Sequence, residues 1–234
     1  MNDKKQIVLN KKMGSLDKLA ALYETSTLLR TLIQLIPSIG SSTDFLISKA
    51  AQDYVRKRHA AFFLDIHNRL NHLETMPNIN NEHLFDLINQ AYSDVLKTHS
   101  IKKIHRFSKI ISDFIVGDIL WDEAETLNKL INDLSDTHVE ILLFATRTPK
   151  SKSFDNLPVF YISKPNEVIE SASPPIVSDN FPNLSSEAMR MFCSELISRN
   201  LLYNEGNSRP FLGGKNVMRK TELADWFLTK VLDI

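Results

Sequence analysis

The sequence predicts a mainly α fold, in which an antiparallel helical bundle is followed by a small α/β module at the C-terminus. Apolar residues return every three or four positions between residues 15 and 146, which is the spacing of amphipathic helices. The chain has only 6 glycines in 234 residues, and six of its 9 prolines fall between 149 and 182. Because proline cannot continue a helix interior, this stretch should separate the bundle from the module. The predicted regions are an N-terminal tail (1–14), the bundle (15–148), a Pro-rich connector (149–184) and the C-terminal module (185–234).

The bundle should begin with two helices that form a hairpin. The first covers 15–36, with Ser15 as its cap, and the corner formed by Pro37 and Gly40 ends it. The second begins at one of residues 41–43 and runs to about Glu74, since it contains neither glycine nor proline.

Four further helices are expected before residue 149. Asn80 or Asn81 opens the third, and Ser100 opens a fourth that Gly117 ends. The fifth covers 119–134, with Leu120 on its apolar stripe, and Ser135 or Asp136 caps a short sixth helix over 139–146. Short connections between helices favour antiparallel neighbours, so the pattern predicts a bundle of about six helices.

The last third of the chain should contain less helix. The run 157–163 predicts one short strand within the connector. Ser185 or Ser186 starts a helix that ends near Asn200, a turn at Gly213 and Gly214 is flanked by short strands, and Thr221 caps a last helix through residue 234.

Two regions could carry function. The hairpin 28–64 is apolar at its tip and has a basic stretch on its second helix, so contact with a membrane surface or a protein partner would use Ile36, Ile39, Arg56, Lys57, Arg58, Phe62 and Phe63. The alternative is that these apolar residues pack within the bundle, as amphipathic stripes usually do. Contact with nucleic acid would use Lys215, Arg219 and Lys220 in the C-terminal module.

Several chemistries find no support in the residue pattern, and we predict no catalytic residue, no metal site, no cofactor and no small-molecule substrate. All seven histidines precede Pro149, and the pair His67 and His72 is five residues apart, whereas two ligands on one helix stand three or four apart. The lone Cys193 lies on an apolar helix face, where cysteine is usually a small buried hydrophobe. The 28 basic and 28 acidic residues cancel, so binding to nucleic acid or an anionic membrane would have to be local.

The order helix, turn, Gly-Gly hairpin and helix in the module resembles part of a winged helix, and the segment from Thr221 to Leu228 carries the likeness. Together with the corner at 36–40 and the segment 134–142, the layout resembles bacterial helical proteins of the abortive-infection alpha type. That resemblance implies a role in defence against bacteriophage, and it implies no catalytic residue.

The sequence thus predicts a non-enzymatic helical interaction protein of a bacterial phage-defence or stress response. Its partner would be another protein or a second copy of the chain. The alternatives are a membrane-perturbing effector that uses the hairpin 28–64 and a DNA-binding regulator that uses the module. One cysteine, and no apolar stretch long enough for a signal peptide near Met1, predict a cytoplasmic location or one at the inner face of the membrane.

Overall fold

The computed structural model describes residues 14–36, 53–73, 80–163, 174–208 and 216–233, and it divides into two compact units. Unit 1 covers Met1–Asp133 and unit 2 covers Leu134–Ile234. The prediction of a mainly helical chain with a small antiparallel sheet near the C-terminus is confirmed.

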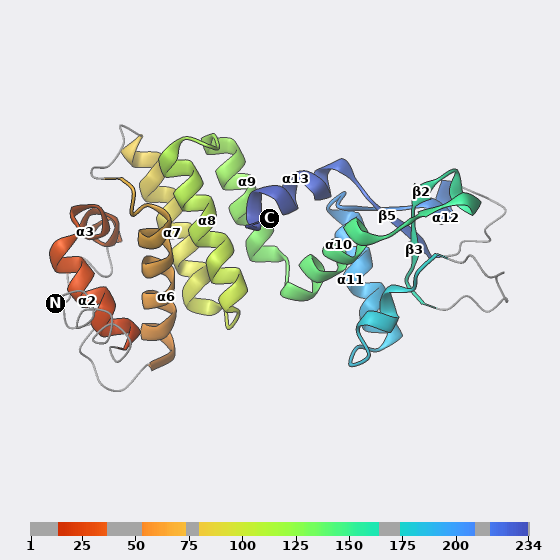
Figure 1. Ribbon diagram of the computed structural model, residues 1–234, viewed down its shortest axis with the longest axis horizontal. Coiled ribbons are helices and arrows are strands. Elements are labelled where there is room, and N and C mark those ends of the chain that lie inside the picture. Colours follow the sequence, from red (N-terminus) through yellow and green to blue (C-terminus); the bar gives the residue numbers. More distant parts are fainter. Residues whose placement is uncertain (1–13, 37–52, 74–79, 164–173, 209–215, 234) are drawn as a thin grey trace, which may run out of the picture. The chain divides into compact units, whose positions relative to one another are not determined.

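Unit 1 is built from helices that pack side by side (Figure 1). Its described helices are α2 (Ser15–Thr25), α3 (Thr27–Gln34), α6 (Asp53–Arg69), α7 (Asn81–Lys97), α8 (Ile101–Val116) and α9 (Trp121–Asp133). The predicted start of the second helix at residues 41–43 and the corner at Pro37 and Gly40 lie outside the described residues.

The helix ends that the sequence predicted most sharply are confirmed by their capping bonds. The Asn80 side chain accepts hydrogen bonds from the amides of Glu82 and His83 at the start of α7. Ser100 accepts from the amide of Lys103 at the start of α8, and Gly117 ends that helix in the left-handed conformation at φ 84°. A residue with a Cβ would be strained at this φ, which explains the glycine.

The first two predicted helices differ from the structure at their ends. The stretch 15–36 is two helices, because the Ser26 side chain accepts a hydrogen bond from the amide of Leu29 and caps α3. The cap of α2 is Gly14 and not Ser15, and α6 ends at Arg69, before the predicted Glu74. A serine inside a helical pattern can end one helix and cap the next. The spacing of apolar residues does not reveal such a break, because it continues on both sides.

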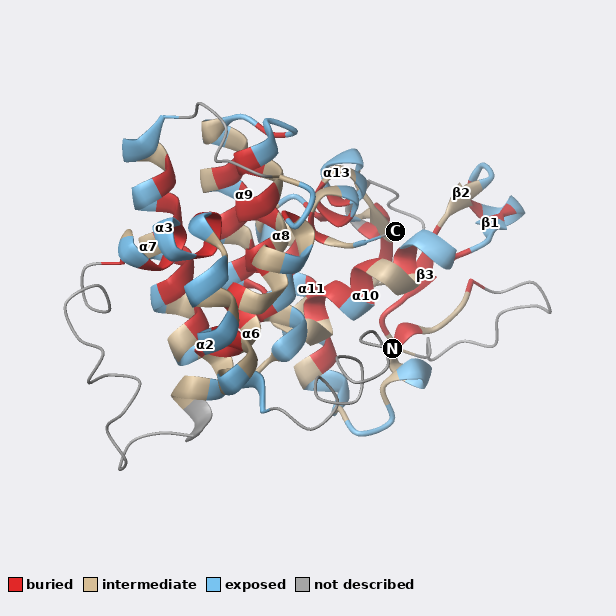
Figure 2. Ribbon diagram, turned by 60° about the vertical axis from the view of Figure 1, so that its left-hand side comes forward, coloured by how far each residue is buried: buried red, intermediate tan, exposed pale blue. Residues whose placement is uncertain are grey.

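The core of unit 1 lies where α6 packs against α8. Phe62, Phe63 and Ile66 from α6 and Phe107 from α8 have no exposed surface. Figure 2 shows the buried stretches of the helices in red. The two helices come close enough for the hydroxyl of Ser108 to donate to the carbonyl of Phe62 at 3.3 Å. Leu120, which was predicted to face inward, is 73% exposed, because it precedes the first residue of α9 and lies off its buried stripe.

Unit 2 combines helices with short antiparallel strands. Its regular elements are α10 (Asp136–Arg147), β1 (Lys150–Ser151), η1 (Lys152–Phe154), β2 (Leu157–Pro158), β3 (Phe160–Tyr161), η2 (Val177–Asn180), α11 (Ser186–Ser198), β4 (Leu202–Asn204), α12 (Glu205–Ser208), β5 (Val217–Lys220) and α13 (Glu222–Val231). Ser135, Ser185 and Thr221 cap α10, α11 and α13, as predicted.

The helix α10 belongs to unit 2, although the sequence placed it in the bundle. It packs against α11 and α13, which come much later in the chain, so only the tertiary fold reveals its place. It also starts three residues before the predicted residue 139, directly after Ser135. The unit boundary therefore follows Asp133 and not residue 148.

The stretch predicted as a connector is partly built into unit 2. Strand β3 joins a three-stranded antiparallel sheet in the order β3-β5-β4, in which Phe160 lies opposite Met218 and Leu202 opposite Lys220. The side chains of Val159, Phe160 and Tyr161 are buried. Residues 164–173 of this stretch lie outside the described part of the chain.

Candidate functional site

The apolar residues of the predicted hairpin surface lie in the core. Ile36 is 1% exposed, and Phe62 and Phe63 are fully buried against each other and against Tyr92, with ring centroids 5.1 to 6.0 Å apart. They therefore offer no surface to a lipid or a partner in this fold. They pack within the helices of unit 1, which was the alternative prediction. Ile39 lies outside the described residues.

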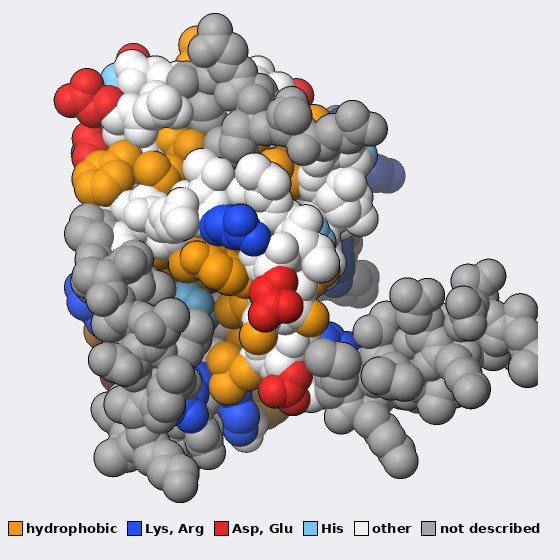
Figure 3. Space-filling model, turned by 90° about the vertical axis from the view of Figure 1, so that its left-hand side faces the viewer, with side chains coloured by type: hydrophobic (Ala, Val, Ile, Leu, Met, Phe, Trp, Pro, Cys, Tyr) orange, Lys and Arg blue, Asp and Glu red, His pale blue; other side chains and the backbone are white. Residues whose placement is uncertain are grey.

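The face of the molecule that carries α2 and α3 mixes residue types. Hydrophobic side chains on this face are interspersed with charged and polar ones (Figure 3). Among the residues that the structure describes, no helix is long and apolar enough to cross a membrane.

The three basic residues on α6, Arg56, Lys57 and Arg58, differ in exposure and in the contacts they make. Arg58 donates to the carbonyl of Leu96, in the last turn of α7, and to Nδ1 of His99 at 2.8 Å. A guanidinium at this place satisfies a carbonyl that the helix end leaves open. Lys57 is exposed and Arg56 is half-buried, so the three cations do not form one continuous outward patch.

The basic residues predicted to contact nucleic acid are paired within unit 2. Arg219 forms an ion pair with the buried carboxylate of Glu205, and its guanidinium lies 5.0 Å from the ring centroid of Tyr203. Lys220 forms an ion pair with Asp225. Lys215 lies outside the described residues. Phosphate binding by Arg219 would have to break the pair with a buried carboxylate, which is costly.

The outward face of α11 is nearly neutral. Its exposed residues are Ser186, Glu187, Arg190, Met191, Ser194 and Ser198. The one arginine and the one glutamate cancel, and Met191 has 53% of its surface exposed. Methionine is enriched in the centres of protein interfaces, whereas DNA-facing helices carry an excess of cations.

A serine, a histidine and a glutamate line up at the start of α10. The Ser135 hydroxyl lies 2.9 Å from Nδ1 of His138, and Nε2 of His138 lies 2.8 Å from the carboxylate of Glu195. The same Nδ1 accepts the backbone N–H of Ser135 at 3.0 Å, while the Ser135 hydroxyl accepts the amide of His138. These reciprocal bonds form a capping box, with a histidine where glutamate is usual. The histidine ring is 3% exposed and packs edge-on against Phe192, so the three residues fix α10 to α11.

The described residues contain neither a reactive thiol nor a group of side chains suited to a metal ion. The thiol of Cys193 is buried, and burial raises its pKa to about 12, so it is protonated at neutral pH. No group of three or more His, Cys, Asp or Glu side chains that could hold a metal ion occurs in the described parts of the chain.

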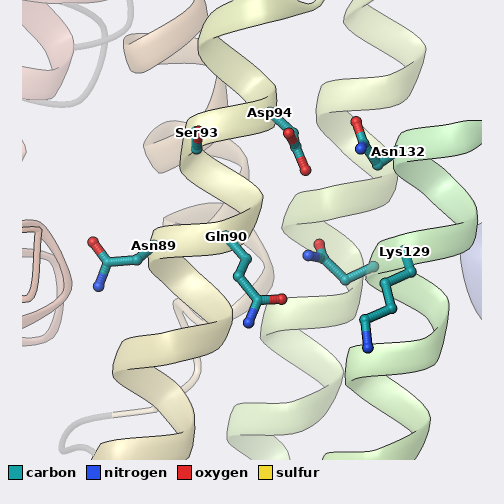
Figure 4. Close-up of a pocket in the computed structure, with 7 residues that line it drawn as sticks. Asn89, Gln90, Ser93, Asp94, Lys129 and Asn132 are labelled. Carbon is teal, nitrogen blue, oxygen red and sulfur yellow. The ribbon is translucent and has the colours of Figure 1, made fainter.

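A polar pocket lies between α7 and α9 in unit 1. It has a volume of about 460 Å³ and is lined by Asn89, Gln90, Ser93, Asp94, Asn128, Lys129 and Asn132. Figure 4 shows Asp94 and Asn132 turned toward the space between the helices, Gln90 reaching toward α9, and Asn89 turned away. Asn89 donates its amide to the carbonyl of Phe85 at 2.7 Å. All seven lining residues are polar or charged, and Gln90, Ser93, Lys129 and Asn132 are exposed, so the pocket opens to solvent.

Burial leaves two lining residues, Asn128 and Asp94, with incompletely compensated polar groups. Asn128 is 3% exposed, and its Oδ1 atom has no hydrogen-bond partner among the described residues. Burial raises the pKa of the Asp94 carboxyl, and the nearby Lys97 and Lys103 partly offset this effect. Lys97 is 3.8 Å from Asp94, and Lys129 is 3.0 Å from Glu125.

The amino-acid pattern predicted no pocket here, although the sequence of α9 contains one clue. Asn128 stands four residues after Ala124 and three before Ile131, on the buried stripe of α9. A carboxamide at an apolar position either finds a partner in the fold or faces a ligand or water.

The comparisons with known proteins assign the chain to no family: no family model, no curated protein and no solved structure matches it.

Proposed function

We propose that the chain is a non-enzymatic interaction protein that binds another protein through the outward face of α11. The observation that carries this proposal is the exposed, nearly neutral face around Met191, with Glu187 and Arg190 offsetting each other. A methionine side chain is flexible and apolar, so it can fill a hydrophobic pocket of a partner. A second copy of the chain is one such partner.

The winged-helix likeness of unit 2 supports this choice of surface. A winged helix has a helix, a strand, two more helices and a strand hairpin, and its last strand lies in the middle of the sheet. Apart from the additional elements β1, η1, β2 and α12, the order α10, β3, η2, α11, β4, β5 and the sheet order β3-β5-β4 resemble that plan, with a 3-10 turn in place of the second helix. The helix that enters the major groove in DNA-binding members corresponds to α11.

The charges of Arg219, Lys220 and the outward face of α11 favour protein over DNA as the partner. A DNA-binding surface neutralises phosphates with free lysine and arginine side chains. In unit 2, Arg219 and Lys220 are paired with Glu205 and Asp225, and the exposed face of α11 has no net charge.

We propose defence against bacteriophage as the biological setting, on the strength of the layout-level resemblance to abortive-infection alpha proteins. Bacteria that express the wild-type chain should give fewer plaques than bacteria that express the Met191→Asp variant. Equal plaque numbers for the wild-type chain and an empty vector would remove this setting and leave the interaction proposal to its own test.

The interaction itself is tested by isolating tagged protein from bacterial cells. We expect one partner at fixed stoichiometry with the wild-type chain, and its loss with Met191→Asp, because a carboxylate at the centre of an apolar contact is poorly tolerated. Ser153→Asp, on the exposed η1 turn, is the matched control and should keep the partner. Recovery that is equal for both variants, or that nuclease treatment abolishes, would contradict the proposal.

A further inference from the structure

We propose that the polar pocket between α7 and α9 binds a neutral, hydroxyl-rich small molecule of about the size of a simple sugar. This inference is independent of the partner surface on unit 2. It begins with Asn128, which lines the pocket and whose buried Oδ1 atom has no partner among the described residues. A ligand donor would satisfy this acceptor once the Asn128 carboxamide turns toward the pocket, because the oxygen has no hydrogen bond to give up.

The lining chemistry selects a neutral ligand. Asp94 and Lys129 are the two charged residues among the seven that line the pocket, and their formal charges cancel. Lys97 lies near Asp94 and Glu125 near Lys129, so neither charge is fully available to a ligand. A strongly anionic or cationic molecule would therefore find no excess of opposite charge.

The lining also selects hydroxyl groups. Gln90, Asn128 and Asn132 each offer a carbonyl oxygen that accepts and an amide that donates, and the Ser93 hydroxyl does both. A sugar hydroxyl likewise donates and accepts, so adjacent hydroxyls of a sugar can form hydrogen bonds with both the carbonyl oxygens and the amide groups of the lining. The lining contains no aromatic side chain on which a flat ring could stack, which disfavours a nucleobase.

The size and position of the pocket fit a small ligand. A volume of about 460 Å³ lies within the range of known small-molecule sites. Because the pocket lies between two helices, a ligand that bridges Gln90 on α7 and Asn128 on α9 would tie these helices together.

The test is an NMR titration of the full chain with D-glucose, D-ribose, N-acetyl-D-glucosamine and glycerol as neutral probes. Inorganic phosphate and arginine are the charged probes. We expect at least one neutral probe to shift the side-chain amide signals of Asn128 and Gln90 at millimolar concentration, and neither charged probe to do so.

Three variants locate the binding. Asn128→Leu removes the unpartnered acceptor and should lower the affinity for the neutral probe by about tenfold or more. Gln90→Ala changes an exposed side chain, so the fold is kept, and it should weaken binding several-fold. Asn68→Ala, on the exposed side of α6 and outside the lining, should bind like the wild type.

Four results would overturn the proposal: no response of the wild type to any neutral probe, a stronger response to a charged probe, unchanged affinity in Asn128→Leu, or unchanged affinity in Gln90→Ala. The first and third outcomes would mean that water alone occupies the space beside Asn128.

Discussion

The imidazole Nδ1 of His59 lies 2.9 Å from the hydroxyl oxygen of Tyr92, inside the aromatic core of unit 1. His59 is 1% exposed, and its ring packs 4.9 Å from that of Phe63. Burial lowers the pKa of His59 from 6.5 to about 4, so the folded state holds this ring neutral at physiological pH.

This relationship predicts that unit 1 loses stability in mild acid. The unfolded chain protonates His59 near pH 6.5, whereas the folded chain resists protonation until about pH 4. The stabilisation is therefore complete above pH 6.5 and is lost as the pH falls toward 4, by at most about 3 kcal/mol. Native-state hydrogen exchange of the α6 amides between pH 7 and pH 5 measures it. His59→Gln should flatten the dependence, whereas His72→Gln, at an exposed position, should leave it as in the wild type.

Replacing Asn128 with leucine should stabilise unit 1. The wild type buries an unpartnered oxygen at this position, and leucine has similar size without it. We expect a gain of about 1 kcal/mol in the free energy of unfolding, measured by urea denaturation. A loss of stability instead would show that the carboxamide makes a structural contact that stabilises α9.

Leu120 and Leu127 should respond very differently to truncation. Leu127 is fully buried, so Leu127→Ala should cost about 2–5 kcal/mol through lost packing. Leu120→Ala should change stability by less than about 0.5 kcal/mol, because that side chain is 73% exposed. Thermal melts of both variants decide the matter, and a large effect at Leu120 would contradict its outward placement.

The ion pairs of Arg219 and Lys220 in unit 2 should also differ in strength. Arg219→Ala takes the cation away from the buried Glu205 and should cost about 1–3 kcal/mol. Lys220→Ala removes a partner of the exposed Asp225 and should cost less than about 1 kcal/mol. In gel-shift assays at low salt we expect no DNA binding by the wild type, and so no change on either substitution. Binding that Arg219→Ala abolished would favour the DNA-regulator alternative.

Local chemistry explains which parts of the fold the sequence could predict. Asn80, Ser100 and Gly117 lie at helix ends, where one capping side chain or one φ angle determines where the helix begins or ends. The apolar period likewise predicted most of the buried face of α7. Ser26 was misread because its cap bond interrupts a pattern that continues on both sides.

The rest depends on contacts between distant segments. The assignment of α10 to unit 2 and the burial of Phe160 in a sheet arise from residues more than forty positions later, such as those of α11 and β5. The pocket could not be predicted either, since Asn132 and Asp94 meet only when α7 and α9 pack together. The sequence alone could not decide whether Phe62 and Phe63 pack in a core or contact a membrane, because both environments favour the same apolar residues.

The central claim, that the outward face of α11 binds a protein, is tested most directly by a photo-crosslinking amino acid placed at position 191. Illumination of living cells should give one discrete protein adduct, either with another protein or with a second copy of the chain, and the same label at position 153 should give none. Adducts with DNA, or an identical pattern from both positions, would contradict the account.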